Sequence, residues 1–114
     1  MSESAWQVFQ LDDLKQKVAG SEPRFLEFLR VSALSAAVYR LPAGARDMQA
    51  PHLEDEIYVV LEGRARLKIG DDEQAVGPGS ILYVEPNATH SFFDIDEDLT
   101  LLAFFGASEP LWKK

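Results

Sequence analysis

Short apolar runs alternate with turn-forming residues along most of this chain, a pattern that is typical of β proteins. The clearest run covers residues 64–69, where Ala65, Leu67 and Ile69 alternate with three basic residues. That period of two predicts a strand with one buried face and one solvated face. The same pattern predicts eight strands, at 24–31, 35–41, 57–61, 64–69, 74–76, 81–84, 90–93 and 99–105. Many short strands joined by tight turns predict a sandwich or a barrel, and eight favour a jelly roll.

One helix is predicted near the N-terminus, over residues 11–19. Leu11, Leu14 and Val18 fall on one helical face, so we expect that face to pack against the rest of the protein. Acidic residues occupy the first turn and lysines the last, which suits the helix dipole. Gly20 follows as a stop signal.

Composition narrows the possible functions. With 114 residues, 46% of them hydrophobic, the chain can form one compact domain and is too short for two. Cysteine is absent, which excludes disulfides, thiolate nucleophiles and cysteine-ligated zinc, so any metal must be bound through nitrogen and oxygen. The net charge of -8 would repel nucleic acid. The N-terminus does not resemble a secretory signal, and the longest nearly apolar stretch, 99–107, is too short for a membrane helix. We therefore expect a cytoplasmic protein that binds neither nucleic acid nor membranes.

The candidate chemistry centres on the two histidines, His52 and His90, which stand where strands are predicted to begin. Glu56 follows His52 by four residues, an even offset that puts both side chains on one face of an extended segment. An imidazole and a carboxylate inside an apolar barrel are costly unless a partner satisfies them, and a divalent cation is a common partner. Taken singly, the same residues also fit a plainer interpretation, in which His52 is a loop residue and Glu56 ends an acidic run.

The spacing of these residues favours the metal site. Two series of residues have regular intervals: Gly44, Ala50, His52, Glu56 and Gly63, and then Gly79, Glu85, Asn87, His90 and Asp94. Both series resemble the two-part signature of the cupin superfamily, G-x5-H-x-H-x3-E-x6-G and G-x5-P-x-G-x2-H-x3-N, with every interval in register. The segment 51–63 also resembles the first part as it occurs in small single-domain cupins.

The resemblance implies an all-β fold, the double-stranded β-helix or jelly-roll-like cupin barrel, with one short N-terminal helix. Residues 1–114 would form a single cupin domain, with an N-terminal strand and helix at 1–23, the barrel at about 24–107 and a tail at 108–114. It also implies a metal held by His52, Glu56 and His90. Two imidazoles and one carboxylate with open positions suit Fe, Mn, Ni, Co or Zn.

The sequence departs from the family pattern at four positions. Glu85, Asn87 and Asp94 replace the usual proline, glycine and asparagine of the second motif, and Asn tolerates the left-handed conformation that such a turn needs. Ala50 is the serious departure, because it replaces one of the family's four ligands.

Ala50 leaves three interpretations open. The position could be an open coordination site for water, substrate or O₂, or it could mark a metal site in decay. In the third, Gln49, Asp47 or Glu54 supplies a ligand instead.

Strand parity predicts the lining of the pocket. The side chains that share a face with the three ligands are Met48, Ala50, Tyr58 and Phe92. This lining is mostly apolar with one phenol, which suits a small organic ligand with an oxygen donor.

These features predict a metal-dependent enzyme, oxygenase-like or isomerase-like, that acts on a small organic substrate. Two alternatives remain: a non-catalytic sensor or carrier that binds a small molecule or a metal, and a cupin that has lost its metal. The apolar segment 24–30, together with Trp6 and Phe9, offers more hydrophobic surface than a small barrel covers, which predicts a homodimer through the N-terminal strands.

Overall fold

Six strands and one short helix make up the described part of the protein. The structure is a computed structural model that describes residues 5–47 and 53–106. In chain order the elements are helix α1 (Leu11–Lys17) and strands β1 (Arg24–Arg30), β2 (Leu34–Leu41), β3 (Glu56–Ile69), β4 (Asp72–Val76), β5 (Ile81–Val84) and β6 (His90–Gly106). The strands form one antiparallel sheet in the order β1-β2-β6-β3-β4. β4 pairs with the second half of β3 and β5 with the first.

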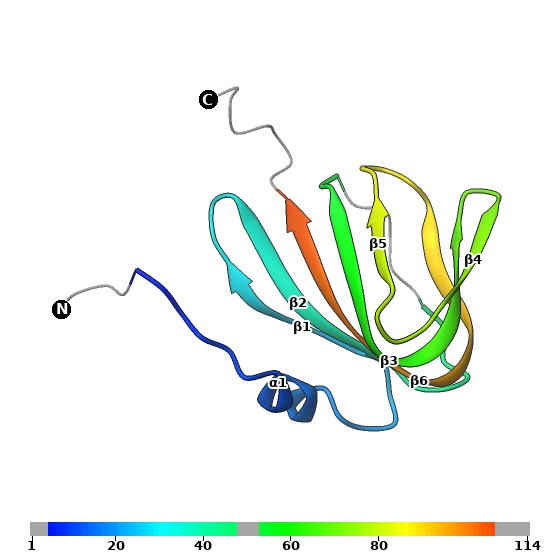
Figure 1. Ribbon diagram of the computed structural model, residues 1–114, viewed down its shortest axis with the longest axis horizontal. Coiled ribbons are helices and arrows are strands. Elements are labelled where there is room, and N and C mark those ends of the chain that lie inside the picture. Colours follow the sequence, from blue (N-terminus) through cyan, green and yellow to red (C-terminus); the bar gives the residue numbers. More distant parts are fainter. Residues whose placement is uncertain (1–4, 48–52, 107–114) are drawn as a thin grey trace.

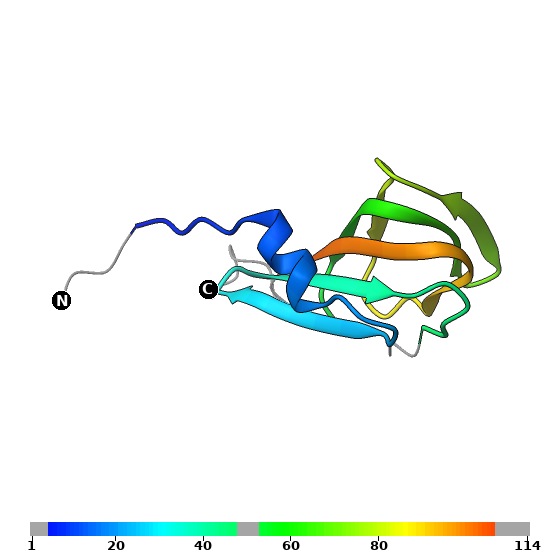
Figure 2. The same ribbon diagram turned by 90° about the horizontal axis from the view of Figure 1, so that it is seen from below.

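The long strands β3 and β6 curl this sheet into a barrel (Figure 1, Figure 2). Glu56 begins β3 opposite Phe105, whereas Ile69 ends β3 opposite His90. If straight, the 14 residues of β3 would span about 45 Å. The side chains of Glu56 and His90 nevertheless approach to 3.2 Å. The pair of strands therefore bends back on itself and brings its two far ends together.

The bend lies at a set of bulges around Gly63. The pairing of β3 with β6 shifts register between Val60 and Arg66, and Gly63 has a φ of +92°. On the other strand Asp94 has a φ of 48°. Bulges of this kind increase the twist of a strand and bend it. The predicted division into separate strands was therefore wrong: the expected strands 57–61 and 64–69 are one strand, β3, and 90–93 and 99–105 are one strand, β6.

The inner face of the curled sheet forms the hydrophobic core. Alternate residues of β2, β3 and β6 point inward, including Tyr39, Leu41, Tyr58, Val60, Ala65, Leu67, Phe92, Leu99, Leu101, Ala103 and Phe105. The prediction for 64–69 is confirmed at Ala65 and Leu67, which are buried, while Ile69 is half-buried.

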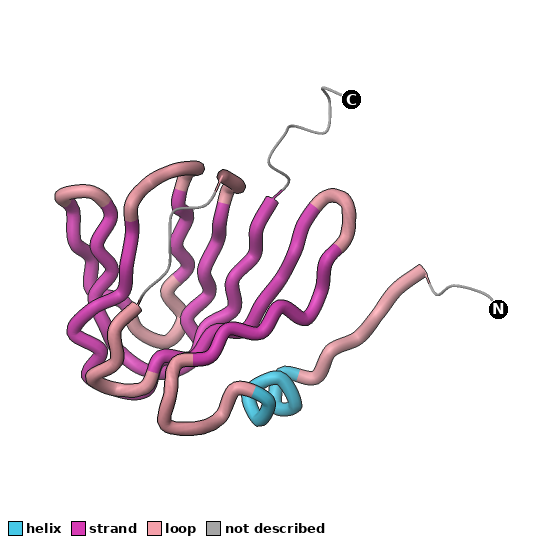
Figure 3. Tube along the Cα trace, turned by 180° about the vertical axis from the view of Figure 1, so that it is seen from behind, coloured by secondary structure: helices cyan, strands magenta, loops and turns pink. Residues whose placement is uncertain are grey.

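Helix α1 covers part of the outer face (Figure 3). Leu14 and Val18 pack on Val38 of β2, beside Leu102 of β6. The helix ends at Lys17 and not at Ala19, and Leu11 is 40% exposed, so only two of the three predicted contacts form. Within residues 5–47 and 53–106, no helix has the length and apolar character needed to cross a membrane.

Candidate metal centre

Glu56 and His90 meet inside the barrel, although 34 positions separate them in the sequence. Their side chains are almost completely buried, with 1% and 2% of their surface exposed. Oε1 of Glu56 lies 3.2 Å from Nε2 of His90. The closure of the β3/β6 pair thus places a carboxylate and an imidazole side by side in an apolar core.

Backbone contacts fix the orientation of the His90 ring. Its Nδ1 lies 2.9 Å from the carbonyl oxygen of Ala88. Because a carbonyl only accepts hydrogen bonds, Nδ1 carries a proton, and in the neutral ring Nε2 has the lone pair. The Tyr58 hydroxyl lies 3.0 Å from that nitrogen and can donate to it. A carbonyl partner on Nδ1 is the usual arrangement of metal-ligating histidines, and here the Tyr58 hydroxyl faces the Nε2 atom that a metal would bind.

The Glu56 carboxylate has no hydrogen-bond partner within the part of the chain that the structure describes. Its 3.2 Å approach to Nε2 of His90 has the distance of an ion pair. Burying an ionised carboxylate without partners is costly. The arrangement therefore needs a positive charge next to Glu56.

Two groups can supply this charge. One is His90 itself: the neighbouring Glu56 carboxylate raises the pKa of His90 above its ordinary value, and the Ala88 carbonyl and the charge of Asp47 act in the same direction against the effect of burial. The other is a metal ion. Donor atoms bound at about 2.1 Å to one first-row metal, at about 90 to 100° to each other, lie about 3.0 to 3.2 Å apart. The Glu56–His90 separation fits that spacing.

Comparison with known proteins gives the family. The profile described as "Cupin domain" matches residues 37–105 of this chain. The chain is a cupin. An uncharacterized protein of Streptomyces coelicolor is 40% identical to this cupin over 101 residues, which cover 89% of the chain and 96% of the relative.

Solved structures share the barrel. A protein with a double-stranded β-helix domain from Klebsiella pneumoniae aligns with a TM-score of 0.75 and 19% identity, over 94% of this cupin and 93% of that protein. DMSP lyase DddQ from Ruegeria pomeroyi aligns with a TM-score of 0.71 and 22% identity over 75% of this cupin. The alignment spans 47% of the lyase. A putative mannose-6-phosphate isomerase from Ralstonia eutropha gives a TM-score of 0.68 and 21% identity, over 79% of this cupin and 89% of the isomerase. These likenesses confirm the predicted cupin fold.

The structure places four of the predicted site residues together. Glu56, Tyr58, His90 and Phe92 all point into the barrel, and the Tyr58 and Phe92 rings meet edge to face with centroids 5.1 Å apart. Their functional roles stay predictions.

Three further predicted site residues, Met48, Ala50 and His52, lie outside the described residues. Within residues 5–47 and 53–106, no three histidine, cysteine, aspartate or glutamate side chains gather in one place. The described part of the centre is therefore the Glu56–His90 pair.

In the second motif, Asn87 adopts the left-handed backbone conformation that the sequence predicts. This residue has a φ of 64°, in the left-handed region where asparagine substitutes for glycine at low cost. The turn leads directly into His90, so the exchange of glycine for asparagine preserves the local geometry that the histidine needs.

Sequence reasoning missed the role of Asp47. Its two carboxylate oxygens accept hydrogen bonds from the Tyr39 hydroxyl at 2.8 Å and from the backbone N–H of Phe92 at 2.9 Å. Asp47 thus links Tyr39 of β2 to Phe92 of β6 beside the centre. Both links are hydrogen bonds, and neither is a bond to a metal. The inward orientation of Tyr39 was predictable, since it shares strand parity with buried Leu41.

Proposed function

We propose that this cupin binds a divalent metal ion through His52, Glu56 and His90 and acts there on a small organic ligand. The observation that carries the proposal is the buried Glu56 carboxylate, which lacks hydrogen bonds within the described residues and faces the Nε2 atom of an oriented histidine. His52 has the motif spacing needed to complete the set. The donors are nitrogen and oxygen atoms, which suit Fe, Mn, Ni, Co or Zn.

A bound divalent metal supplies a Lewis acid that polarises an oxygen atom of the ligand. The chain's own residues orient the donors and keep water away, because Tyr58 and Phe92 are buried beside them. A hollow of about 310 Å³ lies beside Ala45, Asp47 and Phe92, and neither Glu56 nor His90 lines it. The fold is shared with a DMSP lyase and a putative isomerase, so a barrel of this kind can hold an enzymatic site.

One observation favours a second candidate, a cupin that has lost its metal. The Tyr58 hydroxyl already occupies the lone-pair side of His90 at 3.0 Å, and Ala50 removes one family ligand. In that case His90, Glu56 and Tyr58 form a metal-free polar cluster. The two candidates differ in one measurable property, the metal content of the native protein.

The first prediction concerns that content. Protein purified without chelators or a nickel resin is expected to contain about one equivalent of a divalent metal by elemental analysis, and His90→Ala is expected to contain almost none, because it removes an oriented donor. Glu62→Gln serves as the matched control: Glu62 lies on the same strand as Glu56, is exposed and pairs with Lys15, so the variant should retain the metal. A metal-free native protein would support the second candidate, and retention by His90→Ala would refute the ligand assignment.

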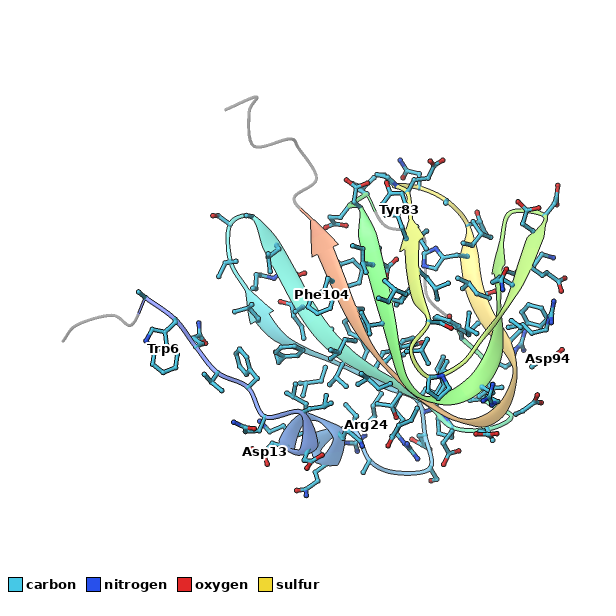
Figure 4. The ribbon with its side chains drawn as sticks, in the orientation of Figure 1. Trp6, Asp13, Arg24, Tyr83, Asp94 and Phe104 are labelled. Carbon is cyan, nitrogen blue, oxygen red and sulfur yellow. The ribbon has the colours of Figure 1, made fainter. Side chains whose placement is uncertain are left out.

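We also propose that two copies pair through their N-terminal segments. Trp6 lies on an arm that extends away from the sheet (Figure 4) and is 71% exposed. Val8 and Phe25 are 63% and 46% exposed, and β1 is an edge strand that pairs only with β2 among the described strands. The exposed apolar side chains of this region amount to roughly 1,000 Å² in two copies, which is about the area that a specific interface needs.

This proposal predicts a dimer in solution. Light scattering at micromolar concentration is expected to give twice the 12.7 kDa chain mass. Phe25→Asp should shift the protein towards the monomer, whereas Tyr83→Asp, on the distant strand β5, should not. A monodisperse monomer for the unmodified protein would refute the proposal.

A further inference from the structure

A third donor atom lies at the candidate metal centre. The hydroxyl oxygen of Tyr58 is 3.0 Å from Nε2 of His90, the same nitrogen that Oε1 of Glu56 approaches at 3.2 Å. Glu56 and Tyr58 are two positions apart on β3, so both side chains point to the inner face. Both oxygens thus lie within 3.2 Å of the same nitrogen in the core.

Both separations match the spacing of donor atoms around a single metal ion. For first-row metals that spacing is about 3.0 to 3.2 Å when the bonds are about 2.1 Å long and about 90 to 100° apart. The distance from the Tyr58 oxygen to Nε2 of His90 therefore fits two ligands of one metal, and so does the distance from the Glu56 oxygen. The sequence also lacks one family ligand, because Ala50 replaces a histidine.

We propose that Tyr58 is a metal ligand of this protein and restores the fourth donor that Ala50 removes. The inference rests on the proposed function, because it requires a metal at Glu56 and His90. As the bond from Oη to the metal forms, the O–H bond breaks and the proton leaves to solvent. Tyr58 then binds as a phenolate.

The burial and packing of Tyr58 favour this assignment. Tyr58 has no exposed surface, and its ring is held against Phe92 with centroids 5.1 Å apart. The oxygen is therefore fixed at the centre without loss of side-chain freedom on binding.

Iron provides a direct spectroscopic test. The metal-free protein is loaded with one equivalent of Fe(II) without oxygen and is then oxidised with one equivalent of ferricyanide, which accepts the single electron. A phenolate bound to Fe(III) gives a strong charge-transfer band in the visible range, and imidazole and carboxylate ligands do not. We expect this band in the unmodified protein and its loss in Tyr58→Phe.

The chain offers two matched controls, because it contains three tyrosines. Tyr39 donates to Asp47 at 2.8 Å, and Tyr83 lies on β5 (Figure 4), where it donates to Asp55 at 2.6 Å. Tyr39→Phe and Tyr83→Phe should both retain the band. Zinc affinity, measured by competition with a chromophoric chelator, should fall about tenfold or more in Tyr58→Phe and remain near the native value in Tyr83→Phe.

The outcomes separate this inference from the proposed function. Stoichiometric iron without a visible band, or a band that persists in Tyr58→Phe, would show that the metal binds without Tyr58 and would overturn the inference alone. If the protein takes up neither iron nor zinc, the proposed function fails, and the inference fails with it. A band that only Tyr58→Phe abolishes, with weaker zinc binding in the same variant, supports both.

Discussion

Replacement of Gly63 by alanine is expected to lower the free energy of unfolding by about 3 kcal/mol. The φ of +92° is unfavourable for any residue with a Cβ atom, which costs about 1 to 2 kcal/mol. A Cβ at this position would also overlap the backbone carbonyl of Asp98 and approach the Cα of Leu99 to 2.7 Å. Because the obstacle is backbone and not a flexible side chain, β3 and β6 would have to separate, which adds about 1 to 3 kcal/mol.

A second glycine separates these two causes. Gly70 has a φ of +58°, and a Cβ added there would meet nothing within 4 Å. Gly70→Ala should therefore lose only about 1 kcal/mol, the part due to backbone conformation. Urea denaturation of the metal-free variants, with equal slopes, gives both differences. Equal losses in the two variants would mean that the close approach of β3 and β6 at Gly63 does not determine stability.

The sequence predicted local structure well because side-chain alternation is a local property. The inward positions of Ala65, Leu67 and Tyr58 follow from the period of two, and each is buried. The left-handed conformation of Asn87 follows from the residue type and its place in a turn. These predictions need no knowledge of what the strand packs against.

The continuity of β3 could not be predicted in the same way. Glycine ends many strands, and at Gly63 its positive φ is used for a bulge inside one strand. Only the partner strand distinguishes these uses, because the register shifts arise from pairing with β6, which lies more than 25 residues further along the chain. The division of β3 and β6 into four predicted strands was wrong for this reason.

Local sequence patterns predicted the candidate site only in part, for the same reason. Even spacing and the motif intervals indicated Glu56 and His90, and barrel closure brings them to 3.2 Å. The contacts that tune the pair join residues distant in sequence, such as the hydrogen bond between Tyr58 and His90 and the bonds of Asp47 to Tyr39 and Phe92. No local pattern encodes such contacts.

Replacement of Glu56 by glutamine is expected to abolish metal binding and, at a pH above the raised pKa of His90, to stabilise the metal-free protein by about 1 to 3 kcal/mol. Above the raised pKa of His90 the ring is neutral, so the native core holds a carboxylate without a hydrogen bond among the described residues. A neutral amide of the same shape removes that buried charge, and burying a charge without hydrogen bonds is costly. Function and stability then favour different residues at position 56.

The way stability changes with pH shows whether the His90–Glu56 interaction stabilises the folded protein. Because Glu56 raises the pKa of His90, their attraction is fully present below the ordinary histidine value and is lost as the pH rises through the raised one. The advantage of Glu56→Gln should therefore shrink by about 1 kcal/mol or more between a pH above the raised value and about pH 5.5. The difference between the two proteins isolates this pair, since the other acidic groups titrate in both.

Glu62→Gln is the matched control for this experiment. Glu62 lies on the same strand, is 49% exposed and pairs with Lys15 at 2.7 Å, so its replacement should change stability by less than about 0.5 kcal/mol at either pH. Zinc should raise the melting temperature of the native protein and of Glu62→Gln, and leave Glu56→Gln unchanged. If Glu56→Gln is instead less stable at the higher pH and still responds to zinc, Glu56 acts as a structural partner of His90. The buried Glu56 carboxylate would then no longer indicate a metal centre.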